Sequence, residues 1–208
     1  MKKTMIAITV FALMITGFVF VGLSVNASTV DTDAILETLE TDDTGAYVLE
    51  DMLILAITDE MVAKATYESI IETFGDIRPF TKIVLAEQTH IDLLLPLFET
   101  YGIQIPEVDV TDIPVYGSVS EALAAGVEAE KANIAIYEAF LAQDLPEDVS
   151  LVFQNLMNAS EHHLQAFSKD RLFGAGYDLA QGFKKMFRHQ SSNSQYGGHG
   201  NNGVCPNA

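Results

Sequence analysis

Apolar residues recur every three to four positions through residues 45–180. This spacing is the period of a helix that buries one face, and no alternating strand pattern competes with it. Two short turns and one long stretch interrupt the period. It therefore predicts four helices, over roughly residues 46–74, 79–101, 118–143 and 146–174.

The lengths of the three connections predict how these helices are arranged. The first, at Gly75-Asp76, and the third, at Asp144-Leu145-Pro146, are short, so each joins antiparallel neighbours. Residues 102–117 have no helical period and contain two prolines, so the middle connection is long. One long crossover between the second and third helices is typical of the ferritin-like variant of the four-helix bundle. We therefore expect an all-α, ferritin-like bundle over residues 46–180.

The two ends of the chain differ from this region in composition. Residues 1–27 begin with two lysines, continue as an apolar run and end in Val-Asn-Ala, which predicts a cleaved signal peptide, with an uncleaved anchor as the alternative. Both readings place the remainder outside the cytoplasmic membrane, as a secreted or extracytoplasmic protein. Residues 28–45, rich in Thr and Asp, predict a flexible leader. Residues 181–208, rich in Gly, Ser and Asn, predict a disordered tail.

The chain is strongly acidic, with 29 Asp and Glu against 11 Lys and Arg and a net charge of −18. Without residues 1–27, which hold two lysines and no acid, the net charge is −20. Such a surface argues against nucleic acid as a partner and attracts metal cations. The single cysteine, Cys205, excludes internal disulfides and cysteine-bound metal clusters. No haem site is evident, and a homodimer is compatible with the sequence.

An internal repeat relates the two halves of the helical region. Residues 59–69, DEMVAKATYES, align with residues 129–139, AEKANIAIYEA, at an offset of 70. The second and fourth helices align through their histidines at an offset of 73. The repeat therefore predicts two similar helical hairpins, in which the equivalent polar residues are Glu60 with Glu130, Tyr67 with Tyr137 and His90 with His163.

Five residues of metal-ligating type fall on helix faces that are otherwise apolar. Glu87-x-x-His90 places two of them one turn apart on one helix, and each of the other three helices adds one more. A buried carboxylate needs a compensating partner, yet Lys64 and Lys131 are placed to reach solvent. A pair of divalent metal ions would neutralise several carboxylates at once. The candidate ligands are Glu60, Glu87, His90, Glu130 and His163.

The fourth helix departs from a symmetric site, because Ser160 stands where a second bridging glutamate is expected. Glu161 is a candidate additional ligand, although one residue is a rotation of about 100° around a helix. His162 has the same ambiguity, and a surface role is its alternative. A dinuclear, a mononuclear and a metal-free site all remain open. Tyr67 and Tyr137, like Ser160, are candidate hydrogen-bonding partners of the carboxylates, with core packing as the alternative for the tyrosines.

Four stretches of the sequence carry a resemblance to a known family. LAITDEMVAKATYE, AEQTHIDLL, GVEAEKANIAIYE and SEHHLQAF are similar to the bacterial and archaeal ferritin-like family catalogued as domain of unknown function 2202. More distantly, the chain resembles rubrerythrin and bacterioferritin. This resemblance implies that the five candidate ligands occupy motif positions, whereas Ser160 does not match. Rubrerythrin also carries a rubredoxin-like, cysteine-bound iron, which a chain with one cysteine cannot build.

Three functions are compatible with these features. A metal-dependent redox protein would bind two iron or manganese ions and react with oxygen or peroxide, in oxidative stress or metal handling. Oxygen and imidazole ligands suit iron, with manganese and zinc as alternatives. A storage module would hold metal ions without turnover. A structural bundle outside the cell would satisfy its inner carboxylates by hydrogen bonds alone, and Ser160 favours this third reading.

Overall fold

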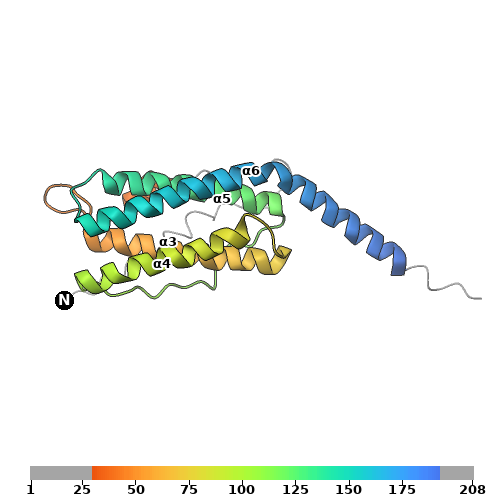
Figure 1. Ribbon diagram of the computed structural model, residues 1–208, viewed down its shortest axis with the longest axis horizontal. Coiled ribbons are helices and arrows are strands. Elements are labelled where there is room, and N and C mark those ends of the chain that lie inside the picture. The colour runs from red at the N-terminus through yellow and green to blue at the C-terminus, as the bar shows by residue number, and fades with distance from the viewer. Residues whose placement is uncertain (1–29, 193–208) are drawn as a thin grey trace, which may run out of the picture.

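The chain forms an all-helical bundle. The computed structural model describes residues 30–192, without the side chains of residues 171–175 and 182–192. This part of the chain contains no strand, and none of its helices is long and apolar enough to cross a membrane. Figure 1 shows the long helices side by side, with α6 (Glu147–Ser192) continuing beyond the others. The helices are α2 (Thr32–Leu36), α3 (Leu49–Phe74), α4 (Phe80–Tyr101), α5 (Val119–Leu141) and α6 (Glu147–Ser192).

Helical structure extends into both segments that were predicted to be flexible. In the leader, the Asp31 carboxylate caps the short helix α2, and Ile35 of this helix packs into the core. At the other end, α6 runs to Ser192 and does not stop near Gly174, since a glycine inside a helix weakens it by only about 1 kcal/mol. The predicted signal peptide and residues 193–208 of the predicted tail lie outside the described residues.

Turn residues delimit the long helices as the sequence predicts. Gly75 follows α3 with φ 91° and Gly102 follows α4 with φ 65°, in the left-handed region that favours glycine. Ser118 caps α5 by accepting a hydrogen bond from the Glu121 amide at 3.1 Å. The Asp178 carboxylate of α6 accepts hydrogen bonds from two further amides at this end of α5. The free amides of the first turn of α5 are therefore satisfied largely by side chains.

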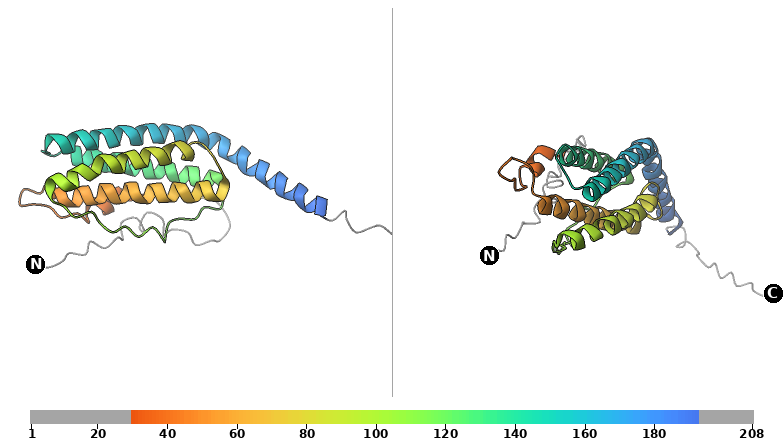
Figure 2. Two further views of the ribbon diagram at one scale, coloured as in Figure 1. Left: turned by 60° about the horizontal axis from the view of Figure 1, so that its bottom comes forward. Right: turned by 60° about the vertical axis from the view of Figure 1, so that its left-hand side comes forward.

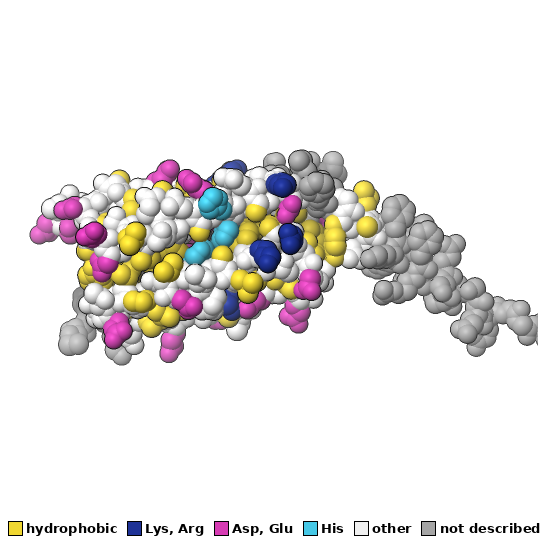
Figure 3. All heavy atoms as spheres, viewed as in Figure 1, with side chains coloured by type: hydrophobic (Ala, Val, Ile, Leu, Met, Phe, Trp, Pro, Cys, Tyr) yellow, Lys and Arg dark blue, Asp and Glu magenta, His cyan; other side chains and the backbone are white. Residues whose placement is uncertain are grey.

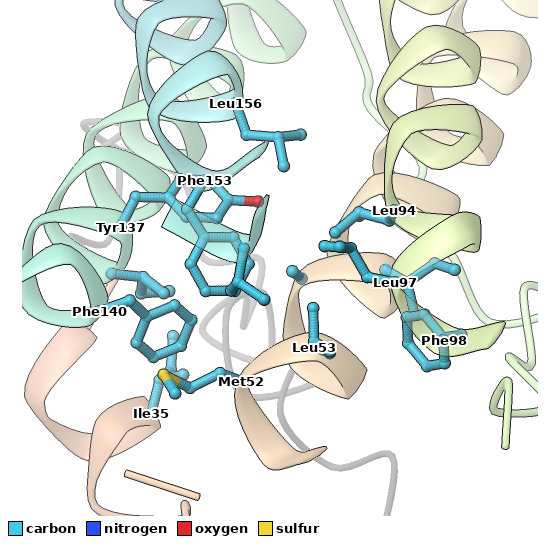
Figure 4. Packing of buried hydrophobic residues seen from close by; sticks show 14 residues of the cluster. Ile35, Met52, Leu53, Leu94, Leu97, Phe98, Tyr137, Phe140, Phe153 and Leu156 are labelled. Carbon is cyan, nitrogen blue, oxygen red and sulfur yellow. The ribbon is translucent and has the colours of Figure 1, made fainter. Parts of the chain in front are cut away.

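Two apolar clusters show how the helices are oriented. One cluster joins the start of α3 and α6 to the end of α4 and α5, and the other joins the end of α3 and the middle of α6 to the start of α4 and α5. Consequently α4 and α5 are parallel, and the connection between them runs the length of the bundle, as Figure 2 shows. Figure 4 shows the packing of the first cluster, which includes Leu53, Leu97, Phe140 and Phe153, while the second includes Tyr67, Phe80, Leu123 and Phe167.

Helices α5 and α6 approach closely at Gly126. A Cβ atom added at this position would lie 2.9 Å from two carbons of the Phe167 ring. That ring is fully buried, and its centroid lies 5.7 Å from that of Tyr67 and 5.4 Å from that of Phe80. Phe167 therefore has little room to move away from a larger residue.

We expect Gly126→Ala to lower the free energy of unfolding by about 1–3 kcal/mol, because overpacking displaces the Phe167 ring. The gain in helix propensity, about 1 kcal/mol, offsets only part of this loss. Gly176→Ala in α6 is the matched control, since a Cβ there meets nothing within 4 Å. It should leave the protein as stable as before or slightly more stable. Urea unfolding measures both variants, and equal stabilities would contradict the close approach at Gly126.

Candidate metal centre

A layer of buried polar side chains lies between the two apolar clusters. On each long helix, its members come between a residue of one cluster and a residue of the other. All five residues predicted as ligands belong to this polar layer, and none is more than 9% exposed. Its members are Glu60 of α3, Glu87 and His90 of α4, Glu130 of α5, and Ser160 and His163 of α6.

One half of the polar layer is formed by α3 and α4 alone. The His90 Nδ1 atom lies 3.0 Å from Glu60 Oε2 and 2.8 Å from Glu87 Oε2. One ligand atom from each of these three residues lies within 4.8 Å of the other two. They therefore form a group that could hold a metal ion.

The other half is completed by α5 and α6. The His163 Nδ1 atom lies 3.3 Å from Glu130 Oε1 and 3.6 Å from Glu87 Oε1. Glu87, Glu130 and His163 make a second group of the same kind. Glu87 belongs to both groups and presents one carboxylate oxygen to each histidine, so the structure brings all five predicted ligands together.

Each buried tyrosine contacts the glutamate of the opposite half. The Tyr137 hydroxyl donates to Glu60 Oε1 at 3.3 Å, and the Tyr67 hydroxyl donates to Glu130 Oε1 at 3.5 Å. The rings of both tyrosines also pack against buried phenylalanines. The tyrosines therefore combine the two roles considered for them, packing in the core and hydrogen bonding to the carboxylates.

Three neighbouring residues of α6 have different positions. Ser160 is 5% exposed, and its hydroxyl lies near enough to the Glu130 carboxylate to oppose the rise in the pKa of that acid. Glu161 and His162 are exposed and belong to neither group, because α6 stays a regular helix and turns them away. The structure thus does not bring the candidate ligand Glu161 to the site. Figure 3 shows the histidine side chains of the described region gathered near the middle of the bundle.

The buried carboxylates have no cationic partner other than histidine among the described side chains. Lys64 and Lys131 point to the surface, where they pair with Glu68 at 2.6 Å and Glu128 at 2.8 Å. Among the described residues, the ion-pair partners of the buried glutamates are His90 and His163. The compensating charge must therefore come from protons or from a bound cation.

In the absence of metal, protons supply that compensation. Burial raises the pKa of Glu87 well above its ordinary value, and the charge of Glu60 and a hydrogen bond to it raise this pKa further. Burial also raises the pKa of Glu130, against the opposing effect of hydrogen bonds from His163 and Ser160. A divalent cation could take the place of these protons.

Asp59 is a partly buried acid near the site that the sequence analysis did not identify as functional. Its side chain is partly buried beside Glu60 and hydrogen-bonds with the Asn133 side chain of α5. Burial, followed by the charge of Glu60, raises the pKa of Asp59 to about 8, against the opposing effect of the Asn133 side chain. The acid and the amide thus link α3 to α5 next to the candidate ligands.

The internal repeat contains a signal for this pair. Asp59 aligns with Ala129, and Asn133 aligns with Ala63. If the two halves are related by an approximate two-fold axis, a contact between residues 59 and 133 has a contact between residues 63 and 129 as its counterpart. The polar pair of Asp59 and Asn133 then occupies one side of the axis, and the pair of Ala63 and Ala129 occupies the equivalent place on the other side. Both departures from the repeat therefore come from a single contact that is polar on one side only.

The donor set fits a pair of divalent metal ions. Its members are carboxylate oxygens and imidazole nitrogens without sulfur, which suits iron, manganese or zinc. Each group offers three ligand atoms, and the shared carboxylate of Glu87 would join two ions. These buried acidic and histidine groups could therefore bind metal.

Comparison with known proteins identifies the family. The chain belongs to the family described as uncharacterized protein domain DUF2202, which its sequence matches over residues 50–181. It is 30% identical over 125 residues to the uncharacterized protein MJ0754 of Methanocaldococcus jannaschii, across 52% of this chain and 67% of that protein. The crystal structure of hypothetical protein MJ0754 from Methanococcus jannaschii is similar, with a TM-score of 0.51 and 26% identity over 62% of this chain and 79% of that one. The family match contains all five candidate ligands.

For the metal-free protein, we expect stability to fall as pH rises from about 4 to about 8. The folded state keeps a proton on Asp59, whose pKa is about 8. The unfolded state releases that proton above about pH 4, so the folded state binds more protons in this range and loses stability as pH rises. Asp59→Asn mimics the protonated acid and should flatten the fall, with a gain of about 1–3 kcal/mol at pH 8.

Urea unfolding at pH 5 and pH 8, with chelator present, measures this difference. Asp112→Asn is the control, because Asp112 is exposed in the long connection. A pH dependence of Asp59→Asn equal to that of the wild type would contradict the buried, protonated state of Asp59.

Proposed function

We propose that this protein is an exported, ferritin-like metal-binding protein that holds two divalent ions and uses them in oxidation chemistry with oxygen or peroxide. Iron is the first choice of metal, with manganese and zinc as alternatives. One observation carries the proposal: five buried ligands from four helices form two groups that share Glu87. The long connection between parallel α4 and α5 supports the ferritin-like assignment, because bundles of this class have one long crossover. The ligand residues support it as well, since di-iron proteins of this class take a glutamate from each of two helices and Glu-x-x-His from each of the other two.

The residues of the polar layer would have different roles in binding the two ions. Glu60, Glu87 and His90 would hold one ion, and Glu87, Glu130 and His163 would hold the other. Tyr137 and Tyr67 fix the orientation of the terminal glutamates through their hydroxyl groups. The apolar clusters on both sides exclude water from the layer. A redox-active metal would supply the exchange of electrons with a small oxidant.

Proton release couples metal binding to pH. Because burial raises the pKa of Glu87 and of Glu130 in the folded, metal-free protein, both acids hold a proton to higher pH than a free glutamate does, and an ion must displace such protons to bind. The affinity for metal therefore rises with pH. The 29 acidic residues of the chain also raise the local concentration of cations around the protein.

Ser160 favours a second candidate, a metal-storage module or structural bundle without turnover. It removes one carboxylate from the polar layer, and the remaining acids already hydrogen-bond with tyrosine, histidine and serine without metal. The distinction rests on two measurements, the metal content of the chain and its reaction with an oxidant.

Metal content tests the shared role of Glu87. The full chain, purified without chelator and supplied with iron, manganese or zinc, should bind two ions, as measured by mass spectrometry of the metal. Glu60→Gln and Glu130→Gln should each lose one ion, whereas Glu87→Gln should lose most of both. Glu161→Gln is the matched control and should keep two ions, because its side chain is exposed. A wild-type chain without metal after this treatment would overturn the proposal.

Oxidation chemistry is tested on the iron-loaded chain. We expect the wild type loaded with ferrous iron to consume oxygen or peroxide faster than the same iron in buffer, because both ions lie in one shared site. Glu87→Gln should fall to the rate of free iron. An oxygen electrode and a peroxide assay measure the rates. Binding of two ions without any consumption would reject the redox function and support the storage module.

A further inference from the structure

The polar layer has an approximate two-fold symmetry, and only one of its three pairs of equivalent positions holds two different residues. The contacts of the two halves correspond residue by residue under the offsets of 70 and 73 in the repeat. His90 with Glu60 at 3.0 Å matches His163 with Glu130 at 3.3 Å, and Tyr137 with Glu60 at 3.3 Å matches Tyr67 with Glu130 at 3.5 Å.

The position that breaks the symmetry holds Glu87 in one half and Ser160 in the other. The two carboxylate oxygens of Glu87 reach His90 at 2.8 Å and His163 at 3.6 Å. Ser160 is about as buried as Glu87, but its short side chain offers one hydroxyl, which lies near Glu130. The layer therefore has three carboxylates where its symmetry would place four.

We propose that a small carboxylate anion, of the size of formate or acetate, binds beside Ser160 and supplies the missing carboxylate of the metal centre. This inference rests on the proposed binding of two divalent ions. It assigns to the same site a ligand that comes from outside the chain.

Charge balance supports an anionic ligand. Three carboxylates and two divalent ions leave one positive charge among the ligand residues when both imidazoles are neutral and the neighbouring Asp59, which lies outside both groups, is not counted. A buried charge without a partner is costly, so a monoanion at this point stabilises the loaded centre. Asp59 does not fill the position, because it belongs to neither ligand group.

The metal ions have room for a further ligand, Ser160 offers a hydrogen-bond donor, and the low exposure of the layer admits only a small anion. Each group consists of only three ligand residues, so a metal ion that takes four to six ligand atoms has room for a ligand from outside the chain. The Ser160 hydroxyl has one hydrogen, which would turn from Glu130 to a carboxylate oxygen of the anion once a metal ion compensates the charge of Glu130. His90 and His163 retain 7% and 9% exposure. The layer thus lies close enough to the surface for a small anion to enter.

The test uses cobalt(II), whose visible absorption reports its ligands and which does not react readily with oxygen at such sites. The full chain is loaded with cobalt and titrated with formate. The wild type should show a saturable change in the cobalt spectrum. Ser160→Ala should respond about fivefold more weakly, since it loses one hydrogen bond to the anion. Ser160→Glu should keep two cobalt ions and show no response, because its own carboxylate occupies the position.

Ser160→Gln fills the same space without charge and should also block the response, with circular dichroism confirming that each variant is folded. Two bound cobalt ions and no spectral change with formate in the wild type would overturn the inference and leave the metal proposal intact. A Ser160→Glu variant that responds like the wild type would overturn it as well. A wild type that binds no cobalt would overturn both proposals, so the two failures are distinguishable.

Discussion

The burial of three carboxylates at one level of the bundle is the constraint to which the surrounding structure responds. Glu60, Glu87 and Glu130 lie between two apolar clusters, where an unpaired charge is expensive. The protein answers with groups that share or donate protons: two histidines, two tyrosine hydroxyls and one serine. Because these donors come from all four long helices, satisfying the acids also fixes how far each helix slides along its neighbours.

Periodicity and the repeat predict most of this arrangement. The inner faces of the four helices, the long connection and the five residues of the two groups follow from apolar spacing and from matching Glu60 to Glu130. The pairing of Tyr67 and Tyr137 with the glutamate of the opposite half does not follow, because it depends on how the hairpins face each other. Ile35 is missed for a similar reason: its helix has five residues, too few for a periodic signal.

Asp59 and Glu161 show that the sequence pattern does not predict burial for residues next to the polar layer. Asp59 was not expected at the site and is partly buried, whereas Glu161 was a candidate ligand and is exposed. Each directly neighbours a position of the polar layer, so each lies about 100° away from it around the helix. On α3 that rotation points Asp59 towards Asn133 of α5, which buries it. On α6 Glu161 follows Ser160, and a rotation of the same size in the opposite sense points it to solvent. Only the position of the neighbouring helix decides between these outcomes, and a single sequence does not contain it.

The division of the polar layer between the hairpins bears on how the protein assembles. Glu60, Glu87 and His90 all lie within the α3–α4 hairpin, so the first group is close in sequence and can form as soon as these helices pair. The second group exists only after the α5–α6 hairpin docks, since it needs Glu87 from the first. The carboxylate of Glu87 is therefore the group through which docking of the α5–α6 hairpin completes the site that the α3–α4 hairpin has begun.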